Sequence, residues 1–103
     1  MSGKYITDDP EISNSLSRTA CAIMLLLYFH TDDHNMVNKK RFMNKSGLDM
    51  DMRTWNKYWA ELEAKSVLVK ASIKLWMLSP DQCYAEGVSQ KALTAEWKQL
   101  LIR

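Results

Sequence analysis

The chain has 103 residues, of which 47% are hydrophobic and 25% are charged. This length supports one compact domain, the apolar share excludes a disordered chain, and three Gly and two Pro exclude collagen-like or linker compositions. The longest apolar run, residues 20–29, is too short to cross a bilayer, which takes roughly 17 to 25 residues. We see no secretory signal, and two cysteines are too few for a disulfide scaffold. We therefore expect a soluble cytoplasmic protein with no membrane partner.

The net charge of +2 is unevenly distributed along the chain. Residues 1–37 are net acidic, whereas residues 38–74 hold nine of the 14 basic residues and only four of the 12 acidic ones. A local excess of positive charge is the usual electrostatic footprint of a polyanion site, although a solvated helix face gives the same count. The middle third of the chain is therefore the candidate binding region.

Residues 1–15 are polar and acidic without a clear period, which favours an N-terminal arm in front of a domain spanning residues 16–103. Ser15 or Ser17 can cap a first helix, because a serine oxygen accepts hydrogen bonds from the free amides at a helix start. Apolar residues then repeat at helical spacing through residue 29 and occupy the opposite side as well. We expect this central helix to be buried nearly all round or to have a partner.

A polar run at residues 30–35 ends the central helix, since Asp and Asn side chains favour turns. Residues 36–37 fit a short extended piece, and Asn38 is a suitable cap for a short helix over residues 39–45. Gly47 follows, and glycine accepts the left-handed conformation common just past a helix end. The sequence thus predicts a second helix that ends in a tight turn.

A third helix is predicted to begin after Asp51, which is a good cap. Trp55, Trp59 and Leu62 fall at i, i+4 and i+7 and form a single apolar stripe, which fixes how the helix faces the core. The other sides near its start are polar and cationic, with Arg53, Thr54, Asn56 and Lys57.

Residues 67–69 and 73–78 are rich in β-type side chains and predict a hairpin. Its second strand ends at Pro80, because proline lacks the amide that a ladder needs. We expect a short turn of helix up to Gly87, and then a last helix capped by Ser89. The apolar side of this last helix consists of Ala92, Leu93, Trp97, Leu100 and Leu101.

This order predicts a mainly α protein with a small β-hairpin, namely a winged helix-turn-helix with an added C-terminal helix. In that architecture the second helix of the pair enters the major groove and the hairpin lies along the backbone. Arg pairs with guanine and Asn with adenine, whereas lysines suit phosphates, which position a protein without reading sequence. The candidate DNA-binding residues are Lys39, Lys40, Arg53, Thr54, Asn56, Lys57, Lys70, Ser72 and Lys74.

Two parts of the chain resemble known proteins. Residues 40–48 and 55–68 are similar to the helix-turn-helix of winged-helix regulators. Residues 75–80 read Leu-Trp-Met-Leu-Ser-Pro and precede Gly87 and a Ser-initiated helix that contains Trp97. This tail resembles the end of the winged-helix family of plasmid replication initiators from Gram-positive bacteria, where a wing strand ends in a Tyr-Met-x-Asn-Pro-like motif followed by an aromatic, a Gly and a final helix.

The resemblance implies base contacts from residues 53–57, a wing at residues 70–74, and structural roles for Pro80 and Gly87. Ser79 stands where the family has Asn. The implied function is double-stranded DNA binding in replication initiation or transcription regulation on a plasmid or phage.

Winged helices also serve in protein contacts, so a second hypothesis stays open. In it the Trp-bearing third helix docks on a polymerase or replication protein of the host. DNA binding requires the basic residues of 38–74 to converge on one face, whereas an adaptor shows a contiguous apolar patch above a few hundred Å².

We also expect a homodimer, because a helix-turn-helix half-site is small and a domain of this size hides only about two-thirds of its surface. The predicted dimer interface consists of Leu93, Trp97, Leu100 and Leu101. A monomer satisfies the same apolar residues if the last helix packs across the central one.

Other chemistry has little support in the sequence. His30 and His34 have helical metal-ligand spacing, but zinc sites need further ligands and no cysteine pair stands nearby. Cys21 lies in the most apolar helix and is expected in the core, and Trp76 is expected to pack rather than to stack on a base. No nucleophile triad, P-loop or dinucleotide fingerprint is present, so we expect no metal, no cofactor and no enzymatic activity.

Overall fold

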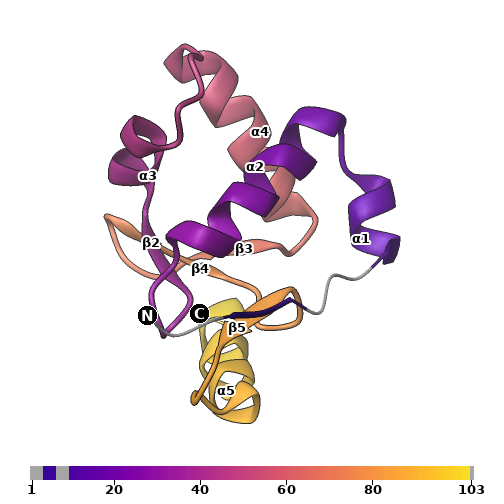
Figure 1. Cartoon of the computed structure of the whole chain (residues 1–103), viewed down its shortest axis with the longest axis vertical. Coiled ribbons are helices and arrows are strands. Elements are labelled where there is room, and N and C mark those ends of the chain that lie inside the picture. Colours follow the sequence, from indigo (N-terminus) through magenta and orange to yellow (C-terminus); the bar gives the residue numbers. More distant parts are fainter. Residues whose placement is uncertain (1–3, 7–9, 103) are drawn as a thin grey trace.

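The computed structural model describes residues 4–6 and 10–102. Parts of the predicted N-terminal arm (1–3 and 7–9) and the last residue of the predicted domain (103) lie outside the described residues. Within the described ranges the chain forms five helices and five short strands, a mixed α/β fold with more strand than the one hairpin that was predicted (Figure 1). The elements are β1 (Lys4–Ile6), α1 (Pro10–Ser15), α2 (Arg18–His30), β2 (Met36–Asn38), α3 (Lys39–Lys45), α4 (Met52–Ala64), β3 (Leu68–Lys70), β4 (Leu75–Leu78), β5 (Cys83–Ala85) and α5 (Gln90–Leu101).

Local capping places four of the helices. Ser17 and not Ser15 caps α2, with its oxygen accepting from the Ala20 amide at 3.3 Å. Asn38, Asp51 and Ser89 cap α3, α4 and α5 in the same way, as predicted. Each cap satisfies an amide that the helix itself leaves free, so these short polar side chains decide where the helices begin.

The main sheet is antiparallel and has the strand order β2-β4-β3. The predicted hairpin is confirmed as β3 and β4, and the predicted extended piece is confirmed as β2. Met77 on the central strand lies opposite Met36 on one side and Val69 on the other. The three strands therefore form one continuous surface on each side of the sheet.

Alternation along the strands divides the apolar residues between two clusters, as the period of two in a pleated strand requires. One side of the sheet faces α2, α3 and α4 and forms the main core, to which the strands contribute Val37, Leu68 and Leu78. The other side faces α5 and forms a smaller back cluster (Figure 1). The back cluster consists of buried Met77, Leu93 and Trp97, with Met36, Val69, Tyr84, Val88 and Leu100 packed against them.

This arrangement corrects the expected use of α5. Leu93 is 2% and Trp97 is 6% exposed, because both cover the back of the sheet within one chain. Neither side chain offers surface to a second copy, and Leu100 is partly buried against the same cluster. Leu101 stays half exposed. The last helix packs on the sheet and not across α2, so the packing that we considered for the alternative, a monomer, was wrong as well.

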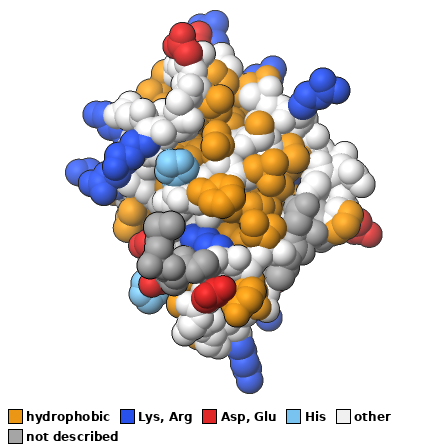
Figure 2. All heavy atoms as spheres, in the orientation of Figure 1, with side chains coloured by type: hydrophobic (Ala, Val, Ile, Leu, Met, Phe, Trp, Pro, Cys, Tyr) orange, Lys and Arg blue, Asp and Glu red, His pale blue; other side chains and the backbone are white. Residues whose placement is uncertain are grey.

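The helix α2 is less completely buried than the sequence predicted. Ile23, Met24 and Leu27 are fully buried, but Leu25 is 47% and Phe29 is 75% exposed. Figure 2 shows an apolar area on this face of the molecule. The helix therefore has one solvent-facing apolar side.

The segment before Gly87 is a strand and not the predicted turn of helix. Here β5 pairs antiparallel with β1, and Tyr5 lies opposite Tyr84 with ring centroids 5.1 Å apart. The Lys4 ammonium also donates to the carbonyl and hydroxyl oxygens of Thr31. The described part of the predicted arm thus carries a strand and the helix α1, and Ile12 packs against the main core.

Candidate nucleic-acid interface

Three of the nine basic residues of the middle third line a groove between α3, the start of α4 and the hairpin turn. We call it the basic groove, and its volume is about 400 Å³. It is lined by Asn38, Lys39, Lys40, Met43, Met52, Ile73, Lys74 and Trp76. Two segments that are far apart in sequence, α3 and the hairpin turn, therefore bring lysines to one place.

Lys39 is the residue that joins the three walls of the basic groove. Its ammonium donates to the Asn56 side-chain oxygen at 2.9 Å. It also lies 5.4 Å from the Trp59 ring centroid and 6.0 Å from that of Trp76, within the range of a cation–π contact. Partial burial lowers the pKa of Lys39, the Glu63 carboxylate opposes this change, and the charge of Lys70 adds to it. Lys39 thus packs against the two tryptophan rings and also contributes positive charge to the basic groove.

The helix α4 has the two faces that its sequence predicts. Trp55, Trp59 and Leu62 are at most 2% exposed and pack in the main core. Arg53 and Lys57 are exposed on the opposite side, away from the residues that line the groove. Asn56, also exposed, lies between these two positions and the groove through its bond to Lys39. The polar face of α4 therefore continues the basic groove outward.

Two predicted DNA contacts, Thr54 and Ser72, have local structural roles. The amide and the hydroxyl of Thr54 both bond to the Asp51 carboxylate, and these bonds hold the pKa of Asp51 below its ordinary value. The Ser72 hydroxyl accepts from the Leu75 amide at 3.2 Å. The side-chain oxygens of Thr54 and Ser72 thus already take part in a helix cap and a turn. The proposed interface therefore depends on the other seven predicted residues.

The turn between β3 and β4 projects two different side chains. The amides of Ala71 and Ser72 donate to the Leu75 carbonyl at 2.9 and 3.1 Å and close the turn. Ile73, at its tip, is 90% exposed, and Lys74 follows it on the wall of the groove. Lys70 is the last residue of β3, where the turn begins, and lies opposite Trp76.

Sequence reasoning missed several residues around α3. Met52 and Ile73 line the groove and are exposed, although apolar residues are normally assigned to a core. Arg41 and Lys45 are exposed on the other side of α3 and line a separate cavity. The four-residue spacing of these two cations was the available signal for a second charged face.

The remaining titratable candidates do not form a reactive centre in the described part of the chain. No group of three or more His, Cys, Asp or Glu side chains is placed to hold a metal ion there. Burial raises the pKa of the Cys83 thiol to about 11, and the Lys4 charge lowers it in part. A thiol with such a pKa is a poor nucleophile, because the thiolate is the reactive form.

Comparison with protein-family models, with curated proteins and with solved structures gives no match. The resemblance to plasmid replication initiators therefore stays a prediction. Among residues 4–6 and 10–102, no helix has both the length and the apolar character needed to span a bilayer.

Proposed function

We propose that this chain is a winged-helix protein that binds double-stranded DNA in replication initiation or transcription regulation on a plasmid or phage. The order α2-β2-α3-α4-β3-β4 and the sheet order β2-β4-β3 support it. In this assignment α4 is the reading helix, α3 precedes it in the helix-turn-helix, and the β3–β4 hairpin is the wing.

The observation that carries the proposal is the meeting of Lys39, Lys40 and Lys74 from two separate elements in one groove beside the polar face of α4. Phosphate contacts from lysines fix position and register, while base edges are read by side chains on the helix in the major groove. A duplex lying along the groove meets lysines on α3 and the wing and meets Arg53 and Asn56 on α4.

The base-reading role is tested by selecting a preferred duplex from a random pool and measuring the affinity of variants for it. We expect Arg53→Ala to lose about 1–3 kcal/mol of binding free energy and to relax preference at one position of the site. Asn56→Ala should behave similarly at another position. The matched control is Lys91→Ala on α5, which removes one exposed charge far from the groove. Unchanged affinity and preference in both α4 variants, with folding intact, would refute the assignment.

The phosphate-binding role is tested with the pair Lys40→Ala and Lys74→Ala. Binding to all duplexes should weaken nearly equally, and the slope of log affinity against log salt should flatten by about 0.9 for each lost phosphate contact. The control is the pair Lys91→Ala and Lys98→Ala, which changes the net charge equally. A loss of the same size in the control pair means that only overall charge matters and contradicts a localised site.

The protein-interaction hypothesis keeps one supporting observation, the exposed side chains of Leu25 and Phe29 on α2. Docking through the tryptophans of α4 has no support, since Trp55 and Trp59 are buried. Complete absence of saturable duplex binding by the wild-type chain would favour the interaction module instead.

A homodimer also belongs to this proposal, because a single half-site is short. With Leu93 and Trp97 buried in the back cluster, the apolar residues left for self-association are Leu101 on α5 and the exposed side of α2. Leu101→Glu and Phe29→Glu should then lower the mass measured by light scattering. A wild-type mass near 12.0 kDa at high micromolar concentration means that the free protein is a monomer.

A further inference from the structure

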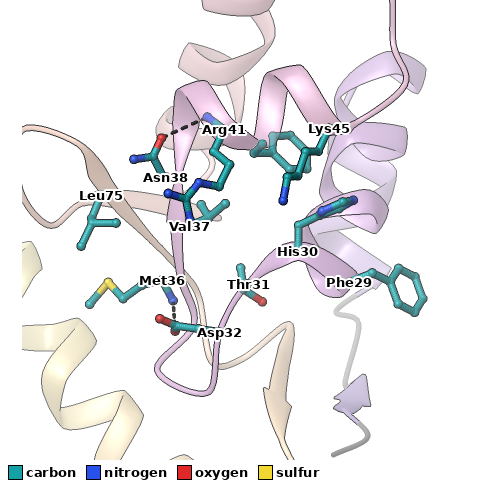
Figure 3. A pocket seen from close by; sticks show the side chains of 11 residues that line it. Phe29, His30, Thr31, Asp32, Met36, Val37, Asn38, Arg41, Lys45 and Leu75 are labelled. Atoms are coloured by element: carbon teal, nitrogen blue, oxygen red, sulfur yellow. Dashed lines mark hydrogen bonds between the residues drawn. The ribbon is translucent and has the colours of Figure 1, made fainter. Parts of the chain in front are cut away.

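A second cavity lies across α3 from the basic groove, between the end of α2, the strand β2 and α3 itself (Figure 3). Its volume is about 400 Å³, within the range of roughly 300–1,000 Å³ that is typical of small-molecule sites. Of the residues that line this cavity and the basic groove, only Asn38 is common to both. We call it the α3 cavity and treat it as a separate site.

Two cations reach the α3 cavity from one helix face. Arg41 and Lys45 are four residues apart on α3, so they project from the same side. Lys39 and Met43 line the groove on the other side, and Lys40 lies between the two, since it also lines a surface hollow with Arg41 and Lys45. Figure 3 shows Arg41 and Lys45 extending from α3 into the space bounded by β2 and the end of α2. In Figure 2, Lys and Arg side chains gather at the side of the molecule where α3 lies.

These positive charges are not neutralised within the cavity. In the described ranges, the side chains of Arg41 and Lys45 make no hydrogen bond or ion pair. Asp32 is the acidic residue in the lining; its Oδ1 atom accepts from the amides of His34 at 2.8 Å and Met36 at 2.9 Å, and its carboxylate makes no ion pair with Arg41 or Lys45. The Thr31 oxygens are bound to Lys4. In this space no described protein group makes a hydrogen bond or an ion pair with the side chain of either cation.

The floor of the α3 cavity is apolar. Val37 is 4% and Phe42 is 2% exposed, and both belong to the main core. The His30 ring meets the Phe42 ring edge-on at a centroid distance of 5.3 Å, and His30 is a polar residue in the lining of the cavity. An apolar floor with a few convergent polar groups is the usual composition of a site that holds an organic ligand.

We propose that the α3 cavity binds a small organic phosphate monoester with an apolar body. The guanidinium of Arg41 matches two phosphate oxygens in a bidentate pair, and the Lys45 ammonium adds a compact charge. His30 contributes a hydrogen bond, and the apolar body rests on the floor formed by Val37 and Phe42. None of the nine residues assigned to DNA lines the α3 cavity.

The test uses the full chain, uniformly labelled with ¹⁵N, titrated with phenyl phosphate at low salt. We expect saturable amide shifts in residues 29–32 and 36–45. Inorganic phosphate should bind about fivefold or more weakly, because it lacks the apolar body, and benzoate should also bind more weakly, because it presents a single charge to two cations. Phenol, which lacks the anion, should give no saturable shift.

Variants separate this site from general attraction to a basic protein. Arg41→Gln and Lys45→Gln should each weaken phenyl phosphate binding by about fivefold or more. The matched control Lys91→Gln should not change it. Preserved dispersion in the amide spectrum shows that each variant is folded. Absence of saturable shifts, equal affinity for inorganic phosphate, equal or tighter binding of benzoate, or equal losses in the control would each overturn the proposal, and none of these outcomes depends on DNA binding.

Discussion

The two sides of the three-stranded sheet are covered to different extents. On one side, α2, α3 and α4 enclose the main core, where the Phe42 ring lies within 6.0 Å of the rings of Trp55 and Trp59. On the other side a single helix, α5, covers the back cluster. The same strands supply both sides, since Leu78 faces the main core and its neighbour Met77 faces α5. Most of the buried apolar surface thus lies on the side that also positions the basic groove.

This difference predicts that the two sides of the sheet contribute unequally to the free energy of unfolding. The side with three helices should determine whether the chain folds, because hydrophobic stabilisation scales with the apolar area removed from water. On the other side, α5 should be able to separate from the sheet while the main core stays folded. Cooperative units with fewer buried contacts open first.

The largest expected effect is that of Trp59→Ala in the main core. Trp59 is 2% exposed and contacts the rings of both Phe42 and Trp76, so its removal should cost about 3–5 kcal/mol of unfolding free energy. Trp97→Ala in the back cluster should cost less, about 2–3 kcal/mol, because its site borders solvent and can collapse more fully. Denaturant unfolding measures both values. A greater loss for Trp97 would reverse the order of the two sides.

The next effect concerns Asn35, whose buried side chain bonds the loop before β2 to β4 and to β5. Its side-chain amide donates to the carbonyls of Leu78 at 3.1 Å and Cys83 at 2.8 Å, and its φ is +60°. Asn35→Ala should cost about 2–3 kcal/mol, since it leaves two buried carbonyls without this donor. Asn35→Gly keeps the positive φ accessible and should lose less than Ala by about 1 kcal/mol. Equal losses would mean that the backbone conformation contributes nothing.

A smaller effect is expected from pH and Cys83, a residue of the main core on β5. Its pKa is about 11 in the folded chain against an ordinary 9.0, so the unfolded chain releases this proton first as the pH rises. The stabilisation is complete below pH 9.0 and is lost as the pH rises toward about 11. Burial lowers the pKa of Lys4, which acts in the opposite direction, so the measurement is the difference between wild type and Cys83→Ala. Parallel unfolding free energies for the two proteins over this range would contradict the prediction.

The smallest effect is expected at the hairpin tip, outside both clusters. Ile73 is 90% exposed, so Ile73→Ser should change the unfolding free energy by no more than about 0.5 kcal/mol. Thermal unfolding of the variant checks this. A loss above about 1 kcal/mol would show that the tip takes part in packing that neither cluster describes.

Local features of the fold were predictable from the sequence, because their causes lie within a few residues. Asn38, Asp51 and Ser89 cap the predicted helices, and the Trp55–Trp59 spacing oriented α4 correctly. A cap or a stripe depends on neighbours along the chain, which a sequence displays directly.

Features that depend on distant partners were missed. The strand β5 is three residues long and pairs with β1, which lies about 80 residues earlier in the chain. No local sequence pattern therefore predicts it. The apolar stripe containing Leu93 and Trp97 indicated that this side of the helix packs against another surface. Periodicity alone does not say whether that surface is the sheet, another helix or a second copy of the chain. In the candidate interface, the polar face of α4 was predictable, whereas the approach of Lys74 to Lys40 depends on how the hairpin folds back.

The ladder between β1 and β5 has a consequence for folding kinetics. It joins Lys4 to Ala85, so its formation closes a loop that includes most of the chain. We expect contacts of such sequence separation to form after the rate-limiting step, because closing a long loop costs entropy before the contacts stabilise the chain. Substitutions in this ladder should therefore accelerate unfolding while leaving the folding rate unchanged. Pairing of β1 with β5 should therefore affect the lifetime of the folded molecule, through the unfolding rate, and not the rate at which it folds.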